Sequence, residues 1–219
     1  MPNANTDQTL KSLEQLYLDG KYDALTDSLL DMRNDLPRGL FHFNLGTVYS
    51  KKENLAVGRY HLEKAISDGY VTTSSLNNLQ VVRQKLAISD ISYSQQLSDV
   101  VLSKGISTPL SAYLFVTLLL VAIIGFFKLW KGWFEGLKKI SLGLFISLIP
   151  IGVGEYIHQY DFAVALQEAE VFEGPSGIYE QKALIPGGSK VILGKFYNGW
   201  YFVERPGGFR GWVKKEALG

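Results

Sequence analysis

LSAYLFVTLLLVAIIGFF, the run Leu110–Phe127, contains 18 residues and no charged side chain. As an α-helix this run would be about 27 Å long, which is close to the hydrocarbon thickness of a bilayer. A second uncharged run, ISLGLFISLIPIGVG, follows at Ile140–Gly154. The alternative is a buried hairpin in a soluble protein, but the first run has no polar side that could face water. We therefore predict a transmembrane hairpin over residues 109–158, with helices at 109–130 and 140–158.

Positive charge is concentrated between the two runs, where four lysines stand against one acid: Lys128, Lys131, Lys138 and Lys139, with Glu135. Lysine and arginine near the ends of a span mark the cytoplasmic side of a membrane. We therefore expect a cytoplasmic loop, with the segments before and after the hairpin on the other side. Within the second run, Pro150 is expected to kink the helix. Three small residues suit close helix packing there: Gly143, Ser147 and Gly154.

The first ten residues, MPNANTDQTL, conflict with this topology. They lack the basic start and the apolar core of a secretory signal, although about a hundred residues would have to cross the membrane. Two explanations stay open: a signal has been removed from this sequence, or the topology is inverted. The asymmetry of the lysines favours the first explanation.

Composition limits the chemistry that the chain can perform. The 219 residues include 22 basic and 21 acidic side chains, so the net charge of +1 gives no indication of a nucleic-acid partner. Cysteine is absent, which excludes disulfides, thiolate catalysis and cysteine-ligated zinc. The three histidines, His42, His61 and His158, are expected on helix faces or at the membrane boundary, and we predict no metal site and no cofactor.

The sequence also lacks the motifs of common enzymes. No nucleophile–base pair, Gly-x-Ser-x-Gly elbow or phosphate-binding Gly-Lys-Ser/Thr loop is present. A hydrolase would need paired acids, but the acids from Glu155 to Glu173 are spread along a junction and a strand. We therefore predict that the chain is not an enzyme.

Residues 42–70 have the spacing of a tetratricopeptide repeat, which they resemble at Leu45, Gly46, Tyr49, Gly58, Leu62 and Ala65. Gly46 and Gly58 would let two helices approach closely, while the larger apolar residues fill the space between them. A weaker copy lies about 33 residues upstream, and a helix at 74–86 begins a third unit that either pairs with 88–102 or caps the stack. This resemblance implies an all-α helical solenoid over residues 1–108.

The first helix of each repeat would line a concave groove that binds a partner. In the central repeat the groove residues would be Phe43, Asn44, Thr47 and Lys51. In the repeat family an asparagine at the position of Asn44 often holds the backbone or carboxylate of a bound peptide. The alternative is that Asn44 is solvated or caps a neighbouring side chain.

After Tyr160 the apolar stretches shorten to strand length, and turn residues separate them. We predict strands at 163–172, 180–185, 190–197, 200–205 and 209–214, a number and spacing typical of a small all-β barrel. Asn198-Gly199 between aromatic residues predicts a type I′ hairpin turn, in which both positions have positive φ.

This segment, residues 163–219, resembles bacterial SH3 domains. The resemblance rests on four runs: Ala165-Leu166 with VFEGP at 171–175, PGGSKV at 186–191, NGWYFV at 198–203 and GWV at 211–213. It implies an SH3-like barrel. Where the family usually has Asn-Val-Arg before Gly-Pro, this sequence has Glu170-Val171-Phe172-Glu173, so the ligand role of the family's arginine is not expected here.

Aromatic residues are dense in this segment, and alternation along strands would bury about half of them. The remaining rings predict a surface groove for a peptide or a cell-wall stem peptide, because rings give contact area at small entropic cost. Its residues would be Tyr179, Tyr197, Trp200 and Tyr201.

The order of helical repeats, membrane hairpin and SH3-like barrel resembles the BatE-like proteins of the bacterial aerotolerance (Bat) operon. That resemblance implies a multi-pass protein of the bacterial inner membrane with both termini in the periplasm. The implied partners are other Bat proteins, some with von Willebrand factor-type domains, and a MoxR-type ATPase. We therefore expect a non-catalytic membrane scaffold or adaptor. The alternative is a cell-wall sensor or anchor that binds peptidoglycan through the barrel.

Overall fold

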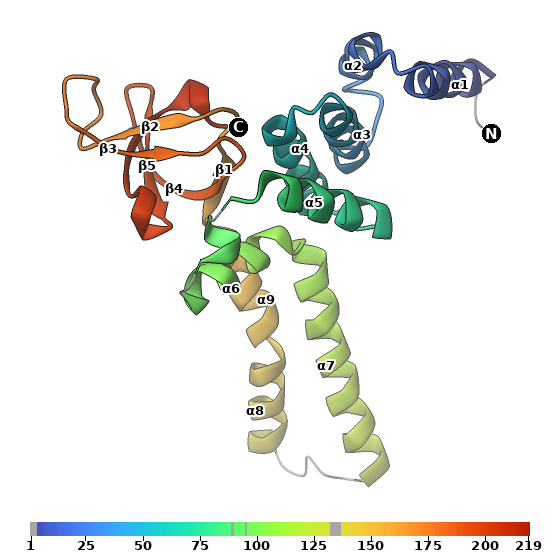
Figure 1. Ribbon diagram of the computed structural model, residues 1–219. Helices are drawn as coiled ribbons and strands as arrows, with labels where there is room; N and C mark the ends of the chain where they lie inside the picture. Colours follow the sequence, from blue (N-terminus) through green and yellow to red (C-terminus); the bar gives the residue numbers. More distant parts are fainter. Residues whose placement is uncertain (1–3, 89, 95, 132–136) are drawn as a thin grey trace.

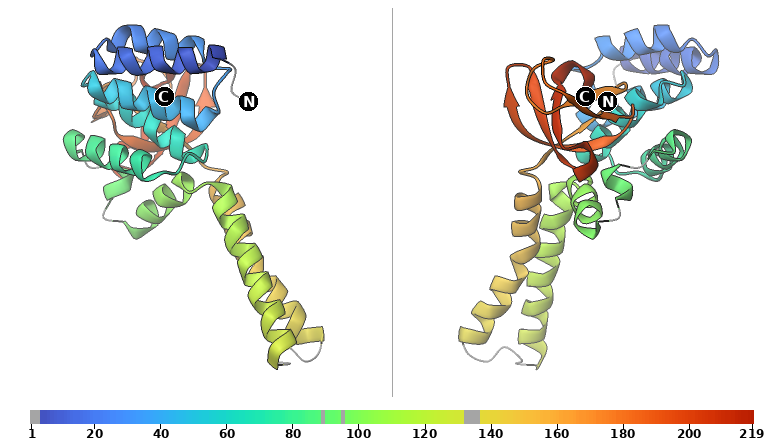
Figure 2. Two further views of the ribbon diagram at one scale, coloured as in Figure 1. Left: turned by 90° about the vertical axis from the view of Figure 1, so that its right-hand side faces the viewer. Right: turned by 60° about the vertical axis from the view of Figure 1, so that its left-hand side comes forward.

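The structure, a computed structural model, describes residues 4–88, 90–94, 96–131 and 137–219. These residues form a group of helices, a long helical hairpin and a six-stranded antiparallel sheet (Figure 1). The first group of helices and the sheet both lie at one end of the hairpin, which projects from them as a stalk (Figure 2).

The chain begins with two helix pairs, and a fifth helix then packs against the fourth. The bounds are α1 Ala4–Leu18, α2 Tyr22–Asp31, α3 Arg38–Lys51, α4 Leu55–Ser67 and α5 Thr73–Leu86. The helix predicted at 74–86 is therefore confirmed.

Helices α3 and α4 cross where two glycines lie at their interface. A Cβ atom on Gly46 would lie 2.7 Å from the side chain of Leu62, and one on Gly58 would lie 2.6 Å from the hydroxyl of Ser50. A larger residue at either position would push the helices apart. Leu45 and Leu62 are fully buried in the same interface. The close approach predicted from these glycines is confirmed.

The segment after α5 joins the helices to the other two parts. A 3₁₀ turn, η1 (Ile91–Tyr93), precedes α6 (Leu97–Ser107), which packs on η1, on α4 and on the end of the hairpin. The hydroxyl of Tyr113 in the hairpin donates to the carbonyl of Gly105 in α6, at 3.1 Å. Helix α6 thus fixes the hairpin to the rest of the protein, and α5 is left as the last helix of the stack.

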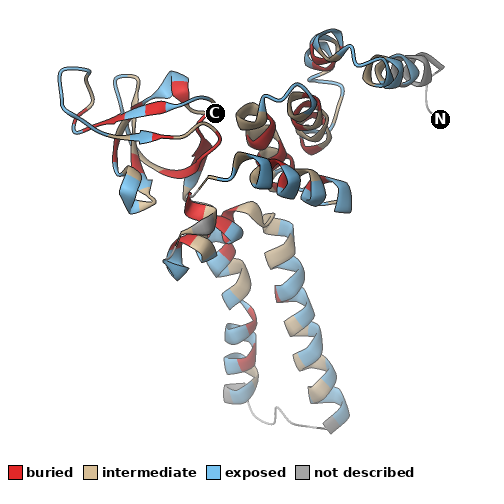
Figure 3. Ribbon diagram, in the orientation of Figure 1, coloured by how far each residue is buried: buried red, intermediate tan, exposed pale blue. Residues whose placement is uncertain are grey.

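The hairpin consists of α7 (Leu110–Lys131) and a bent second arm, α8 (Leu137–Ser147) followed by α9 (Ile149–Ile157). Each arm contains one helical span that is long and apolar enough to cross a membrane. These spans are Leu110–Trp130 in α7 and Lys139–Ile157, which runs through α8 and α9. Only 6% and 17% of their most apolar windows are buried within the protein. Figure 3 shows that most residues along both arms are exposed or intermediate. A buried core hairpin, the alternative considered above, would have covered these side chains.

The bend between α8 and α9 follows from Pro150, which has no amide hydrogen and lies in the first turn of α9. The backbone amide of Ile151, the residue after Pro150, donates a hydrogen bond to Oγ1 of Thr117 in α7, at 3.2 Å. An amide left unpaired away from water is costly, and this bond supplies a partner for it at the bend. The predicted kink is confirmed. The three small residues of this arm are buried: Gly143, Ser147 and Gly154.

The C-terminal sheet has the strand order β1-β4-β5-β6-β2-β3. The bounds are β1 Asp161–Val164, β2 Ala169–Phe172, β3 Gln181–Ile185, β4 Lys190–Tyr197, β5 Trp200–Arg205 and β6 Gly211–Lys214. All neighbouring pairs are antiparallel, but the edge strands β1 and β3 do not pair with each other. The prediction of a closed barrel is therefore wrong: within residues 137–219 the sheet is open at this seam.

The single strand predicted at 163–172 is also wrong, because the structure divides it into β1 and β2. Strand β1 pairs with β4, whereas β2 pairs with β6 and β3 near the other edge of the sheet. The chain must cross between these positions, so residues 165–168 turn instead of extending. The hairpin turn is as predicted, with φ of 44° at Asn198 and 82° at Gly199.

Two apolar cores hold the sheet and its neighbours. One lies within the curved sheet and includes Val171, Ile185, Val191, Val203 and Val213, which are all fully buried. The other lies where η1, α6, α9, β1 and β4 meet, and its members are Ile91, Ile106, Ile157, Phe162, Val164 and Ile192. The helices, the hairpin and the sheet therefore share a common core.

Candidate functional site

The groove residues predicted in the helical part lie along one face of α3. Phe43, Asn44 and Thr47 line a pocket of about 240 Å³ that α1 and α2 also border. Thr47 and Lys51 line a second pocket of about 240 Å³, which continues to α5. Tyr17 of α1 borders both pockets. The structure therefore brings all four predicted residues to one surface, between the first helix of each pair and α5.

Two of these residues are held by internal contacts. The Phe43 ring lies 5.0 Å from the ring of Tyr70, and the Thr47 hydroxyl accepts a hydrogen bond from Asn78 at 3.0 Å. Asn44, by contrast, is half-buried and makes no side-chain hydrogen bond to any residue that the structure describes. Lys51 is exposed at the end of α3. Asn44 and Lys51 therefore have polar groups available to a ligand.

The four aromatic residues predicted in the sheet do not share one face. Tyr197 and Trp200 are cross-strand partners beside the turn, so their side chains lie on the same face. Tyr201 follows Trp200 in β5 and points to the other face, where its ring lies 4.8 Å from that of Phe196. Tyr179 lies between β2 and β3, with its ring against Gly174. A ligand role for these residues stays a prediction.

Trp200 belongs instead to an aromatic row on the outer face of the sheet. Phe172, Trp212 and Phe202 are register partners across β2, β6 and β5, and the last two rings lie 5.4 Å apart. The ring of Trp200 packs edge-on against Phe172 at 5.4 Å. Lys214 and Arg210 lie over rings of this row. The alternation of Trp200 and Phe202 in β5 is the signal in the sequence that could have identified this face.

The lysines that define the predicted topology belong to the end of α7 and the start of α8. These two helix ends lie at the tip of the hairpin that is far from the sheet (Figure 1). Lys128 and Lys139 are exposed there. The side chains of Lys131 and Lys138 are outside the described part of the structure, and so is Glu135.

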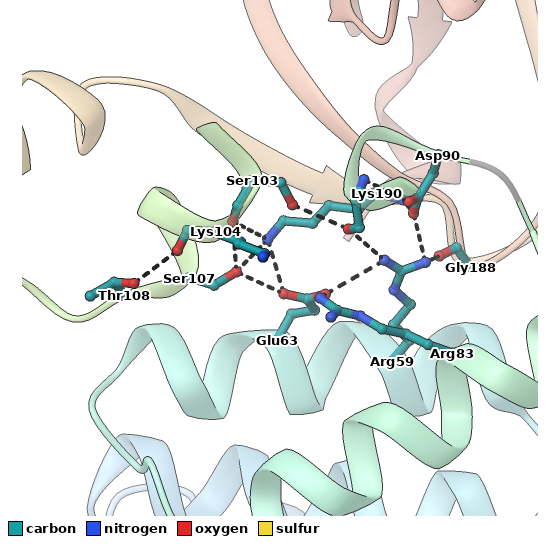
Figure 4. A network of polar contacts seen from close by, with 11 residues as sticks. Arg59, Glu63, Arg83, Asp90, Ser103, Lys104, Ser107, Thr108, Gly188 and Lys190 are labelled. Carbon is teal, nitrogen blue, oxygen red and sulfur yellow. Dashed lines mark hydrogen bonds and ion pairs between the residues drawn. The ribbon is translucent and has the colours of Figure 1, made fainter. Parts of the chain in front are cut away.

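Sequence reasoning missed a cluster of buried charges where the helices meet the sheet (Figure 4). Arg59 and Glu63 of α4, Asp90 before η1 and Lys190 of β4 are all fully buried. Arg59 Nη1 lies 2.6 Å from Asp90 Oδ2 and donates to the carbonyl of Gly188 at 2.9 Å. Lys190 Nζ lies 2.9 Å from Glu63 Oε2. We call this set, together with Arg83, the junction cluster.

Further bonds tie the junction cluster to α5 and α6. Arg83 Nη2 lies 2.5 Å from Glu63 Oε1. Lys190 Nζ donates to the hydroxyl of Ser107 at 2.7 Å, and that hydroxyl lies 3.1 Å from Glu63 Oε2. The backbone amide of Lys190 donates to Asp90 at 2.7 Å. The cluster therefore connects four separate elements through charge-assisted bonds.

The electrostatics of the cluster are set by burial and by the pairing of charges. Burial raises the pKa of Glu63. The positive charges of Lys190, Arg83 and Arg59 have a larger effect in the opposite direction, and they hold this pKa well below its usual range. Burial lowers the pKa of Lys190, and Glu63 opposes this shift. Three cationic side chains face two carboxylates, so the junction cluster carries an excess of one positive charge.

A larger pocket opens next to the junction cluster. It has a volume of about 510 Å³ and lies between α4, α5, α6 and the start of α7. Its apolar lining is Ile66, Val71, Leu76, Leu79, Pro109 and Ala112, and its polar lining is Arg83, Ser92, Ser103, Lys104, Ser107 and Thr108. The lining contains two cations and no carboxylate.

Two of the histidines form a pair between α3 and α4. Their Nδ1 atoms lie 2.9 Å apart, so only one of the two atoms carries a proton in this geometry. Burial, with a contribution from His42, lowers the pKa of His61 to about 3. Within the described residues, no group of three or more histidine, aspartate or glutamate side chains could hold a metal ion.

Comparisons with known protein families, with curated proteins and with solved structures found no match.

Proposed function

We propose that this chain is a non-catalytic membrane scaffold that binds protein partners through the groove on α1, α3 and α5. The observation that carries this proposal is the groove itself. Asn44 lines one of its two pockets and Lys51 lines the other, beside apolar side chains, and the polar groups of both residues are available to a ligand. An extended peptide with an acidic group suits this combination, because a lysine attracts the charge and an amide can bond the backbone. The tetratricopeptide resemblance supports the same conclusion.

The membrane hairpin supports a scaffold that works at a fixed position. Helix α6 and the second apolar core hold the groove and the sheet against one end of an outwardly apolar hairpin. A partner bound in the groove would therefore lie at a defined distance from the lipid surface. The proposed topology places the loop with Lys128 and Lys139 in the cytoplasm and both larger parts in the periplasm of a bacterial inner membrane. Proteins of a Bat/MoxR-type stress-tolerance system are the proposed partners.

Photo-crosslinking in native membranes tests the proposed groove. A photoreactive residue at Asn44 should capture one or a few membrane or periplasmic proteins, and a second change, Lys51→Glu, should reduce this capture. The matched control is a photoreactive residue at Asp27, which is exposed on α2 outside the groove pockets. Equal capture from both positions, or none from Asn44, would contradict the proposal.

The aromatic row of the sheet favours a second function, which is binding to peptidoglycan. Rings with cations above them can stack on sugars and hold the acidic groups of a stem peptide. The full chain in detergent should then sediment with cell-wall sacculi, and Trp200→Ala should reduce the bound fraction. Phe196→Ala, a change on the opposite face of the same hairpin, is the control. A protein that stays in the supernatant would exclude this function.

A further inference from the structure

We propose that the 510 Å³ pocket beside the junction cluster binds an anionic phospholipid. The inference rests on the proposed placement of the hairpin in a membrane, but it does not depend on the partner groove. The pocket combines apolar side chains with cations and hydroxyls, and Pro109 and Ala112 at the start of the proposed membrane helix α7 also line it. A lipid whose headgroup stays at this level of the membrane could enter from the side.

The polar half of the pocket suits a phosphate group. Arg83 of α5 lines this half, together with Lys104 and the hydroxyl-bearing Ser103 and Ser107 of α6. Guanidinium, ammonium and hydroxyl groups are the usual donors to phosphate oxygens in proteins. Lys104 is exposed and forms no ion pair with any described residue. Its charge is therefore available to a ligand.

The charge balance around the pocket favours an anion over a neutral or cationic ligand. No carboxylate is among the residues that line the pocket, and Glu63 of the adjoining junction cluster is already bonded to Lys190 and Arg83. The junction cluster contributes one excess positive charge and Lys104 contributes another. An anion would reduce the repulsion between these cations, which lie in a partly desolvated site.

The apolar half of the pocket suits an acyl chain and not a free ion. Ile66 of α4 and Leu76 and Leu79 of α5 supply apolar side chains to the lining beside the cations. Leu76 and Val71 are about half exposed, at 48% and 46%, although they border a pocket. A chain lying along them would cover this surface, which free phosphate would leave in water. The volume is within the range of small-ligand sites, so it would hold a headgroup and the first part of one chain.

The full chain, delipidated in an uncharged detergent, tests this inference. Native mass spectrometry would compare adducts with phosphatidylglycerol and with phosphatidylcholine of the same acyl chains. We expect tighter binding of phosphatidylglycerol. Lys104→Gln should weaken it about fivefold, the effect of one cation near an anionic lipid surface. Lys195→Gln, which removes an exposed lysine from β4, should leave it unchanged.

Three results would overturn the inference: equal binding of the two lipids, equal effects of the two lysine variants, or competition by inorganic phosphate at concentrations equal to those of the lipid. The apolar wall has its own variant, Leu76→Glu, which should weaken phosphatidylglycerol binding without disturbing the groove. Fractionation separates this inference from the proposed function. If the chain is recovered without membranes, the membrane placement fails; if it is recovered with membranes but retains no preference for phosphatidylglycerol, only the lipid site fails.

Discussion

The hairpin and the junction cluster have opposite relations to their surroundings. In the hairpin, large apolar side chains such as Phe115 and Phe145 point outward, with 66% and 70% of their surface exposed. At the junction, Arg59, Glu63 and Lys190 are charged and fully buried. The apolar residues of the hairpin need a partner outside the chain, which the bilayer supplies in our proposal. The charges of the junction are instead paired with one another within the chain.

The largest expected effect comes from removing a carboxylate from the junction cluster. Glu63→Gln would leave the fully buried Arg59 and Lys190, and the partly exposed Arg83, with Asp90 as the remaining carboxylate. Removing one partner from a buried ion network costs about 3–5 kcal/mol, because the other charges stay buried without compensation. The free energy of unfolding of the full chain in detergent, followed by tryptophan fluorescence in urea, would measure this loss.

The control for this change is Glu53→Gln. Glu53 also pairs with a lysine, Lys85 at 2.9 Å, but both side chains are about half exposed or more. An exposed pair contributes less than about 1 kcal/mol. Equal losses for the two glutamate variants would show that burial at the junction has no special role.

The next effect tests the other side of the comparison, the apolar exterior of the hairpin. Leu118→Arg would place a charge near the middle of α7, at a position that is 58% exposed. Insertion of such a helix into a membrane becomes less favourable by about 3 kcal/mol. We expect a smaller fraction of the variant in membranes after alkaline carbonate extraction.

Leu97→Arg is the matched variant outside the hairpin. Leu97 is more exposed still, at 77%, but it lies at the start of α6. Its replacement should leave membrane association unchanged. If Leu118→Arg instead increased the soluble yield of intact protein with no loss from membranes, the exterior of the hairpin would face water.

The same comparison explains what the sequence could predict. The hairpin, its kink at Pro150 and the glycine crossing of α3 and α4 depend on residues close in the chain, and each was predictable. The junction was not, because Lys190 and Glu63 are 127 positions apart and each resembles an ordinary surface charge in its own segment. Arg59 and Glu63, four residues apart on a helix, have the spacing of a solvent-exposed pair.

The sheet shows the same limit. The turn at Asn198-Gly199 is local and was predicted, whereas strand order is not local. The residues that separate β1 from β2 carry no strong turn signal, and only the pairing of these strands at distant places in the sheet shows why the chain bends there. The groove in the helices was predictable as a surface, but the contacts that restrain Phe43 and Thr47 come from residues further along the chain.

A third expected effect concerns pH and the histidine pair. The pKa of His61 is lowered to about 3, so between pH 6.5 and pH 3 the unfolded chain binds a proton that the folded chain does not. Stability should therefore fall as pH falls through this window. From pH 7 to pH 5 the loss is about 2 kcal/mol for this residue. His42, whose pKa burial also lowers, adds to the loss.

His61→Gln should reduce this dependence, which urea unfolding of the full chain at pH 7 and pH 5 would measure. Glu63 does not account for the change, because its contribution is lost only below the usual pKa of a glutamate, near 4.5. A loss of the same size in the variant would assign the pH dependence to other groups.

The smallest expected effect on stability comes from a single hydrogen bond inside the hairpin, between Ile151 and Thr117. Like the bonds at the junction, it pairs polar groups within the chain. Thr117→Val keeps the shape of the side chain but removes the acceptor for the amide of Ile151. Hydrogen bonds between membrane helices contribute about 0.6 kcal/mol on average and at most about 1.7 kcal/mol. The values are modest because the polar groups of unfolded helices find other partners in lipid. We expect a loss of about 1 kcal/mol in detergent unfolding.

Thr108→Val is the control, since the Thr108 hydroxyl bonds a carbonyl of its own segment, that of Lys104. The effect of Thr117→Val should disappear when Pro150→Ala restores a continuous helix, because the amide of Ile151 then finds the carbonyl four residues before it. A loss that persists in this double variant would mean that Thr117 stabilises the hairpin by packing alone. The coupling between the two changes therefore decides whether the buried hydroxyl of α7 is present because of the bend in the opposite arm.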